Sequence, residues 1–392
     1  MTAAHAPHGL LKNRLLVCLG PGGVGKTTIS ATLALSAAIV GRRVDVMTVD
    51  PAPRLLDALG LGGVNAAEPH EVALDDLALD GIHDTGMTDD AAGGLAGAGV
   101  AARRRPARRA GRLRALRMDP KRTFDGIIAR HAPSPAAADA IMQNRIYRNL
   151  SQALAGVGDY MAMERLLELS EEPATDLVVL DTPPAREALD FLDAPRRLLE
   201  LLNSRAVTLL GGGMRRGFSV VDLAARAVLS AFDRLTGLHM LGDVQAFVRS
   251  FDGMYAGFAE RAARAQRLLV APDTAVVVVT TAEPERIAQA HEFLAALRAA
   301  EIEPRAVIVN RTLPPIVPHE QIARAPLEPA LKRKLARAAA EFAALKQRET
   351  AAIASLRAGE SPDLELVAAP DLGREPADLA DLARLGQSFE IA

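Results

Sequence analysis

The sequence predicts an α/β fold, a doubly wound and mostly parallel sheet with a helical insert, and three observations support this prediction. A short apolar run, Arg14 to Leu19, leads through a glycine-rich loop into an Ala/Leu-rich segment of helix length. Further apolar runs of strand length follow, separated by segments long enough for crossover helices. Two of these runs end in an aspartate, at the sheet edge where open α/β sheets bind ligands.

The composition limits the classes of protein to which the chain can belong. Its 392 residues carry 46 Lys and Arg against 48 Asp and Glu, a net charge of −2. This balance argues against a protein that coats nucleic acid with its whole surface. The single cysteine, Cys18, excludes an internal disulfide and a cysteine-clustered metal site within one chain. With no signal-peptide pattern and no apolar run near the roughly 18 residues of a membrane span, we expect a cytoplasmic protein.

The glycine-rich loop carries the most specific chemistry in the sequence. Gly20, Gly22 and Gly25 fit a dinucleotide fingerprint, but Lys26 and Thr27 complete the G-x-x-x-x-G-K-[ST] pattern of a triphosphate-binding loop. Backbone N–H groups would hold the phosphates, Lys26 would reach the β- and γ-phosphates, and the Thr27 hydroxyl would ligate Mg²⁺. A plain strand-to-helix turn and a nicotinamide site are the weaker interpretations. The predicted nucleotide-binding residues of the loop are Gly20, Pro21, Gly22, Gly23, Val24, Gly25, Lys26, Thr27 and Thr28.

Two aspartates are predicted at the carboxyl edge of the sheet. Asp50 follows the apolar run Arg43 to Val49, and Asp181 follows Asp176 to Leu180. In phosphate-loop enzymes such a position holds the metal directly or through water. Asp181 is therefore a candidate for the Mg²⁺ shell, and Asp50 for orienting and deprotonating the water. Each taken singly could equally be a turn or helix-cap aspartate.

The rest of the chain continues the alternation of strands and helices. Ala275 to Thr281 and Arg305 to Asn310 are predicted as strands, and residues 284–300 between them as a crossover helix. A further strand is expected over residues 364–369. The Ala-rich segment from Glu328 to Arg357 predicts one long or two shorter exposed helices.

Four motifs in this order resemble the ArsA-type ATPase family: GPGGVGKTT, TVDPAPRLLDAL, VVLDTPPAREALDFLDAP and VIVNR. This family contains the arsenite-pump ATPases and the targeting factors for tail-anchored membrane proteins. The resemblance implies an ATPase with ATP and Mg²⁺ that works as a homodimer, two nucleotides facing each other across the interface. It makes Lys26 and Asp50 catalytic, adds Asn310 as the reader of adenine, and puts Pro370 and Asp371 in the loop flanking the base.

Three departures from the family pattern limit what carries over. The family usually has a second loop lysine where this chain has Pro21, and in related dimers that lysine crosses to the partner's nucleotide. The arsenite pumps collect the metalloid with several cysteines, whereas Cys18 lies mid-strand and is expected to be a core residue, which disfavours arsenite transport. No C-x-x-C motif exists, so the zinc-clasped dimer of some relatives is not expected and neither is zinc.

Residues 200–270 are predicted to form a helical subdomain, because apolar and aromatic residues recur there at helix spacing. In the targeting relatives a helical lobe of this kind forms a groove for a client helix. The simpler interpretation is that the apolar stripe packs this lobe onto itself and the sheet. The candidate groove residues are Phe232, Phe247, Phe251, Tyr255 and Phe258.

Two segments are expected to lie outside the folded core. Residues 1–13 are predicted as a flexible tail and residues 76–115 as a low-complexity insert rich in Arg, Ala and Gly, which leaves 14–392 as a single ATPase domain. From Arg103 to Arg122 there are ten Lys or Arg and one Asp. Such a run could bind nucleic acid or anionic lipid, but it lacks interleaved aromatics. A solvated loop is therefore favoured, and nucleic acid is not expected as a partner.

The sequence therefore predicts an ATP-hydrolysing conformational switch whose purpose stays open between several hypotheses. The first is the energy-coupled handling of a hydrophobic client helix. The second is a pump-driving subunit with a membrane partner. The third is a nucleotide-gated interaction module with little turnover, or a partition-type protein that binds DNA through its arginine run.

Overall fold

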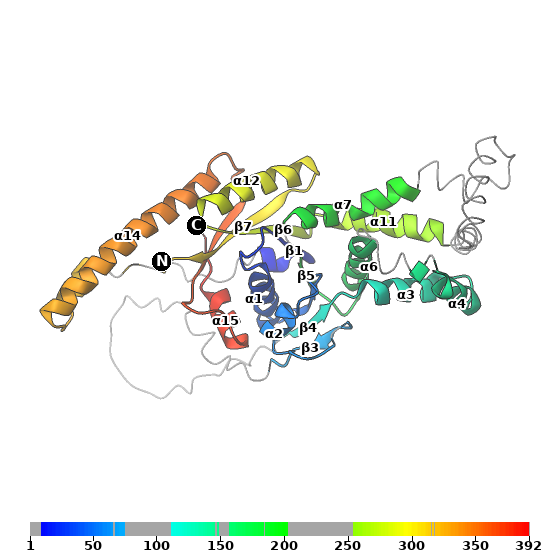
Figure 1. The fold of residues 1–392 in the computed structure, drawn as a ribbon, viewed down its shortest axis with the longest axis horizontal. Helices are drawn as coiled ribbons and strands as arrows, with labels where there is room; N and C mark the ends of the chain where they lie inside the picture. Colours follow the sequence, from blue (N-terminus) through cyan, green and yellow to red (C-terminus); the bar gives the residue numbers. More distant parts are fainter. Residues whose placement is uncertain are drawn as a thin grey trace, which may run out of the picture.

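The computed structural model describes residues 9–65, 67–74, 111–145, 147–148, 157–183, 185–202, 254–314, 316 and 318–391. In this part of the chain one nine-stranded sheet has the strand order β3-β4-β2-β5-β1-β6-β7-β8-β9 (Figure 1). All neighbouring pairs from β4 to β8 are parallel, and β3 and β9 run antiparallel at the two edges. The strands are β1 (Leu15–Leu19), β2 (Arg43–Thr48), β3 (His70–Glu71), β4 (Arg112–Arg117), β5 (Leu177–Asp181), β6 (Thr274–Thr281), β7 (Pro304–Thr312), β8 (Glu365–Pro370) and β9 (Glu390–Ile391).

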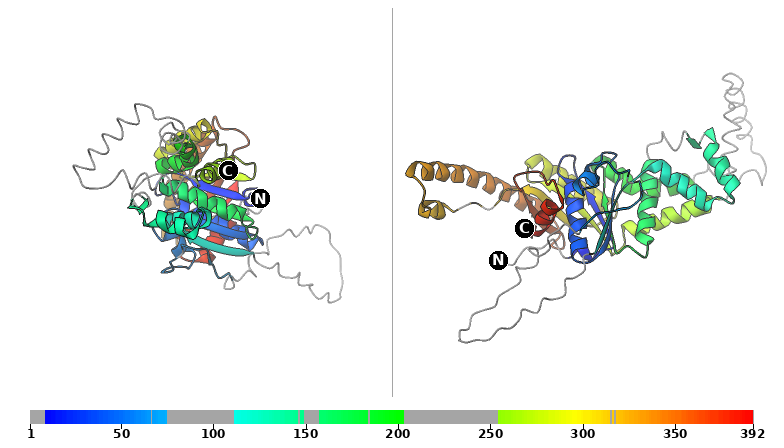
Figure 2. Two further views of the ribbon diagram at one scale, coloured as in Figure 1. Left: turned by 90° about the vertical axis from the view of Figure 1, so that its right-hand side faces the viewer. Right: turned by 90° about the horizontal axis from the view of Figure 1, so that it is seen from below.

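Helices cover both faces of the sheet, which confirms the predicted doubly wound α/β fold (Figures 1 and 2). One face packs against η1 (Leu10–Lys12), α1 (Lys26–Ile39), α2 (Arg54–Ala58) and α15 (Leu379–Gln387). The other packs against α6 (Val157–Glu171), α7 (Ala185–Leu202), α11 (Tyr255–Leu269), α12 (Pro284–Ala299) and α14 (Pro329–Arg357). The remaining described helices are α3 (Pro120–His131), α4 (Pro135–Gln143) and α13 (His319–Arg324).

The central strand β1 shows why these apolar runs become strands. Leu16 and Cys18 point into the core on the side of α1, whereas Leu15, Val17 and Leu19 point into the core on the other side. A parallel strand with both faces covered reads as a continuous apolar run, because alternate side chains are buried on opposite faces. Cys18 is fully buried and therefore a core residue, and this burial raises the pKa of its thiol to about 12.

The expectation of an insert over residues 76–115 is wrong at its C-terminal end, because this end belongs to strand β4. Arg112–Arg117 pairs with β2 in the sheet and buries Leu113 and Ala115, whereas residues 75–110 lie outside the described part of the chain. Arg114 donates from Nε to Asp45 Oδ1 at 2.6 Å and from Nη2 to Asp45 Oδ2 at 2.6 Å. A buried carboxylate needs a paired charge, and Asp45 in β2 is fully buried. At least one arginine of the basic run thus belongs to the core.

The N-terminal end also differs from the expected flexible tail over residues 1–13. Leu10 and Leu11 in η1 are each only 3% exposed and pack into the α1 side of the core. Asn13 donates from Nδ2 to the carbonyls of Gly9 and Leu10 at 3.2 and 2.9 Å, which closes this turn. Residues 10–13 are therefore part of the folded body, because two consecutive leucines gain more from burial than the tail loses in chain entropy.

A helical lobe, made of α3, α4, α6, α7 and α11, extends beyond one end of the sheet (Figure 1). Its interior contains Phe258, which is 5% exposed, with its ring centroid 6.3 Å from those of Phe124 and Tyr160 and with Arg261 stacked on its ring. Phe258, the candidate groove residue whose side chain the structure describes, thus packs against other helices of the lobe. The other candidate groove side chains, Phe232, Phe247, Phe251 and Tyr255, lie outside the described part of the structure.

At the opposite end of the molecule, the Ala-rich segment forms one continuous helix, α14, which projects from the sheet (Figures 1 and 2). Among the helices that the structure describes, none combines the length and apolarity needed to cross a bilayer.

We predict that Arg114→Met lowers the free energy of unfolding by about 3 kcal/mol, because it leaves the buried Asp45 carboxylate without its cation. The matched control is Arg122→Ala, whose partner Glu68 is 3.0 Å away in an exposed pair, and which should cost less than about 1 kcal/mol. Urea unfolding followed by circular dichroism measures both. Equal losses in the two variants would contradict the structural role given to Arg114.

Candidate nucleotide-binding site

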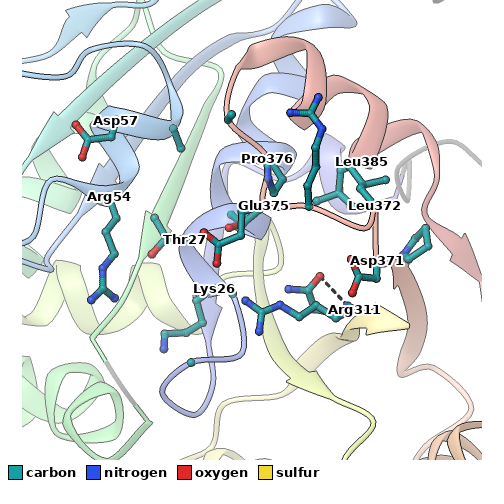
Figure 3. Close-up of a pocket in the computed structure, with 18 of the residues that line it drawn as sticks. Lys26, Thr27, Arg54, Asp57, Arg311, Asp371, Leu372, Glu375, Pro376 and Leu385 are labelled. Carbon is teal, nitrogen blue, oxygen red and sulfur yellow. Dashed lines mark hydrogen bonds between the residues drawn. The ribbon is translucent and has the colours of Figure 1, made fainter. Parts of the chain in front are cut away.

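A cleft of about 920 Å³ opens at the carboxyl ends of the parallel strands, where α1, α2 and the segments after β7 and β8 meet (Figure 3). Most of the predicted binding residues line it, but Gly20, Pro21, Val24 and Asp181 are not among the lining residues. The predicted residues that line the cleft are Gly22, Gly23, Gly25, Lys26, Thr27, Thr28, Asp50, Asn310, Pro370 and Asp371.

Two glycines of the loop between β1 and α1 have no room for a side chain. Gly20 has φ +150°, and a Cβ there would lie 2.1 Å from the carbonyl oxygen of Val279. Gly25 has φ +86°, and a Cβ there would lie 2.3 Å from Asn310 Nδ2. α1 begins directly after Gly25 with no acidic residue in its first turn, so the N–H groups of this turn remain available to an anion.

Lys26, the first residue of α1, is buried with its side chain folded back onto the loop. Its Nζ donates to the carbonyl oxygen of Pro21 at 3.0 Å. Burial lowers the pKa of Lys26 from its ordinary value, while the negative charges of Asp181 and Asp50 oppose this shift. The ammonium group is therefore within electrostatic reach of both carboxylates.

Asp181, at the end of β5, is 1% exposed and gathers three hydroxyl groups. Its Oδ2 accepts from Thr27 Oγ1 at 2.9 Å and from Thr48 Oγ1 at 3.0 Å, and its Oδ1 accepts from Ser30 Oγ at 3.3 Å. Burial raises the pKa of Asp181 to about 6, so the carboxyl is ionised at neutral pH. Adjacent hydroxyl and carboxylate oxygens fit Mg²⁺, which takes one or two protein ligands beside phosphate and water.

Asp50 lies on the rim of the cleft, held by its own turn. Its Oδ1 accepts from the backbone N–H of Ala52 at 2.9 Å, and its backbone N–H donates to Thr48 Oγ1 at 3.2 Å. Since Thr48 also donates to Asp181, one hydroxyl links the Asp181 carboxylate to the backbone of Asp50. The structure thus brings Lys26, Thr27 and Asp50 to the lining of the cleft, with Asp181 hydrogen-bonded to Thr27.

Asn310 lies at the end of β7 on the other wall. Its Nδ2 donates to the Val24 carbonyl at 2.8 Å, and its Oδ1 accepts from the Arg311 N–H at 2.9 Å. The side chain of Asn310 is buried, and its hydrogen bond to Val24 holds the loop against the sheet. The reading of adenine by Asn310 stays a prediction. Pro370, the last residue of β8, and Asp371 line the same wall.

Sequence reasoning missed several side chains of the site. Ser30 and Thr48 donate hydrogen bonds from their hydroxyl groups to Asp181. In the sequence, these two residues could have been noticed because each lies within four residues of a predicted site residue, Lys26 or Asp50. Arg54 and Arg311 line the cleft (Figure 3) and stand within the TVDPAPRLLDAL and VIVNR motifs. Arg311 has φ +57° and is the extra residue of a β-bulge against β8.

The sequence model of the anion-transporting ATPase family matches residues 13–87 and 113–326. This chain belongs to that family. The resemblance predicted from four motifs is therefore confirmed, and ATP hydrolysis is supported as the activity of the family. The match leaves out residues 88–112, within the segment expected as an insert.

Among curated proteins, the chain is 28% identical over 318 residues to an uncharacterised protein of Streptomyces coelicolor, covering 80% of this chain and 66% of that protein. It is 25% identical to a protein named ATPase GET3 from Malassezia globosa, over 58% of this chain and 56% of the relative. It is likewise 25% identical to an ATPase GET3 from Chaetomium globosum, over 47% and 43%. The chain thus spans roughly two fifths to two thirds of the length of these relatives.

We predict that Asp181→Asn stabilises the nucleotide-free protein at pH 8 by up to about 3 kcal/mol, the equivalent of the raised pKa. The folded carboxyl ionises only near pH 6, whereas an unfolded aspartate ionises near pH 4. Wild-type stability therefore loses this contribution as the pH rises between about 4 and 6, and the amide does not. The neighbouring hydroxyls can donate to Asn or accept from it.

Urea unfolding at pH 4.5 and pH 8 measures this effect, with the difference between the proteins expected to shrink at the lower pH. Asp57→Asn is the matched control, because this aspartate of the same cleft is exposed. An Asp181→Asn protein that is less stable than wild type at pH 8 would contradict the prediction.

Proposed function

We propose that this protein is a Mg²⁺-dependent ATPase that acts as a dimeric nucleotide switch. One observation carries the proposal: the buried carboxylate of Asp181 accepts from Thr27 and Thr48 beside the buried Lys26. Mg²⁺ requires oxygen ligands such as the Asp181 carboxylate and the Thr27 hydroxyl. A triphosphate requires positive charge and N–H donors such as those of Lys26 and the start of α1. Membership of an ATPase family supports the same activity.

In the proposed reaction, the loop amides and Lys26 bind the phosphates of ATP, and Thr27 and Asp181 hold Mg²⁺. When bound, the ion would neutralise charge on the phosphate oxygens. Asp50 orients a water molecule and accepts its proton while the water oxygen forms a bond to the γ-phosphorus. The bond from that phosphorus to the oxygen that bridges the β- and γ-phosphates breaks, and ADP and phosphate are released.

The chain contributes mainly position and charge to this reaction. The Asp50 carboxylate is fixed by the Ala52 N–H, so it loses little freedom when a water binds. The Lys26 ammonium is buried, and a charge in a site with little water stabilises a developing anion more strongly than the same charge in bulk solvent.

We also propose a homodimer and a hydrophobic client helix or membrane partner as the purpose of the switch. The relatives named ATPase GET3 and the helical lobe next to the sheet support this part of the proposal. A pump-driving subunit and a nucleotide-gated module with little turnover are the alternatives.

For catalysis, we predict that Asp50→Asn binds ATP within about twofold of wild type but hydrolyses it at least about 100-fold more slowly, because the water loses its base. Lys26→Ala should weaken ATP binding by at least about tenfold, because a charge-assisted contact to phosphate is lost. Phosphate release and calorimetric titration measure the two effects. Asp139→Asn, on the exposed face of α4, is the control.

The outcome separates the candidate functions. Hydrolysis that survives in Asp50→Asn would overturn the role given to this carboxylate. If wild type binds ATP with Mg²⁺ and turns it over no faster than Asp50→Asn, the nucleotide-gated module becomes the better description.

For assembly, we predict that the Asp50→Asn protein sediments as a dimer with ATP and Mg²⁺ and shifts towards monomer with ADP. The physical reason is that only the bound triphosphate would supply charge for contacts across the interface. Sedimentation velocity at several protein concentrations measures this equilibrium. A monomer under both conditions would contradict the dimeric switch and leave the ATPase site intact.

A further inference from the structure

The cleft contains four cationic side chains, and they differ in how they are engaged. Lys26 donates to the Pro21 carbonyl at 3.0 Å, and Arg374 donates to Asp381 Oδ1 at 2.7 Å. Arg54 and Arg311 make no side-chain hydrogen bond or ion pair with any residue that the structure describes. Two guanidinium groups thus face the proposed phosphate site without a partner in the described part of the chain.

Arg54 is fixed at its backbone, and its guanidinium group has no partner among the described residues. It is the first residue of α2, and the next two residues, Leu55 and Leu56, are 0% and 2% exposed in the core beneath it. The turn before it is stiffened by Pro51 and Pro53. The helix therefore holds the Arg54 Cα in a defined place, while the exposed side chain extends into the cleft.

The side chain of Arg54 extends towards the phosphate end of the cleft. Figure 3 shows its guanidinium group directed to the same end of the cleft as the Lys26 ammonium group, with the Asp57 carboxylate pointing away from it. The two cations are close enough for the charge of Arg54 to contribute to the lowered pKa of Lys26. Arg54 also stands four residues after Asp50, on the same turn-and-helix segment.

We propose that Arg54 is a second phosphate-binding cation that contacts the γ-phosphate of ATP. This inference rests on the proposed function. The loop carries Lys26 but has Pro21 where ArsA-type ATPases usually have another lysine, so it supplies one cation of its own. Arg54 adds positive charge from α2. Its planar guanidinium group can donate two parallel hydrogen bonds to phosphate oxygens, which an ammonium group cannot.

The contact distinguishes ATP from ADP, because the γ-phosphate is the group that ADP lacks. Lys26 binds both the β- and γ-phosphates and would support both nucleotides. Arg54→Gln should therefore weaken binding of a non-hydrolysable ATP analogue by about tenfold and leave ADP within about twofold, the loss expected for one charge-assisted contact. Arg54→Lys should recover part of the affinity for the ATP analogue.

The experiment is calorimetric titration of the full chain with both nucleotides in the presence of Mg²⁺. Arg333→Gln, which removes an exposed arginine on α14, is the matched control. Thermal unfolding by circular dichroism shows whether each variant is folded, and Arg54→Lys provides a second reading if Arg54→Gln is not.

Three results would overturn the assignment. They are unchanged affinity for the ATP analogue in Arg54→Gln, an equal loss for ADP, and a loss of the same size in Arg333→Gln. A wild-type chain that binds neither nucleotide would instead overturn the proposed function, and the assignment of Arg54 would fall with it.

Discussion

The buried carboxylate of Asp181 is the constraint on which the candidate site depends. A desolvated carboxylate is costly unless it is hydrogen-bonded or paired, and this one accepts from hydroxyls of α1 and β2. The parallel register of β2 and β5 pairs Thr48 with Asp181, so the sheet itself brings this hydroxyl to the carboxylate. Asp50 follows two residues later, and its distance from the loop is set by the same register. Any slip of β2 would separate the two carboxylates.

A second contact joins the two walls of the cleft. Asn310 at the end of β7 holds the carbonyl of Val24, and the space it occupies is available only because residue 25 has no side chain. The same Asn310 accepts from the N–H of Arg311, the bulged residue, and so supports a backbone conformation that non-glycine residues rarely adopt. The side chain of Asn310 therefore joins the loop, the bulge and β7 through two hydrogen bonds.

Much of this architecture could be predicted from the sequence, because central parallel strands are continuous apolar runs and a phosphate loop has a fixed spacing. The six strands predicted from such runs are found within two residues of their expected bounds. The strand β4 could not be predicted, since its arginines resemble a solvated charge run until Arg114 is seen to neutralise Asp45, 69 residues away. The roles of Thr48 and Ser30 were missed for the same reason. Each hydroxyl donates to a carboxylate more than 130 residues further along the chain, and only the fold brings the two groups together.

The electrostatics of the cleft suggest why it would accept a metal and a triphosphate together. Burial lowers the pKa of Lys26 and raises the pKa of Asp181, and both shifts favour the neutral form of the group. Each charge therefore lacks part of the solvation that it would have in water. A cation alone would compensate Asp181 but repel Lys26, and an anion alone would do the reverse. A magnesium complex of a nucleotide carries both charges at fixed separation and would compensate both groups at once. The same incomplete solvation that reduces the stability of the fold would therefore favour this ligand over free phosphate or free Mg²⁺.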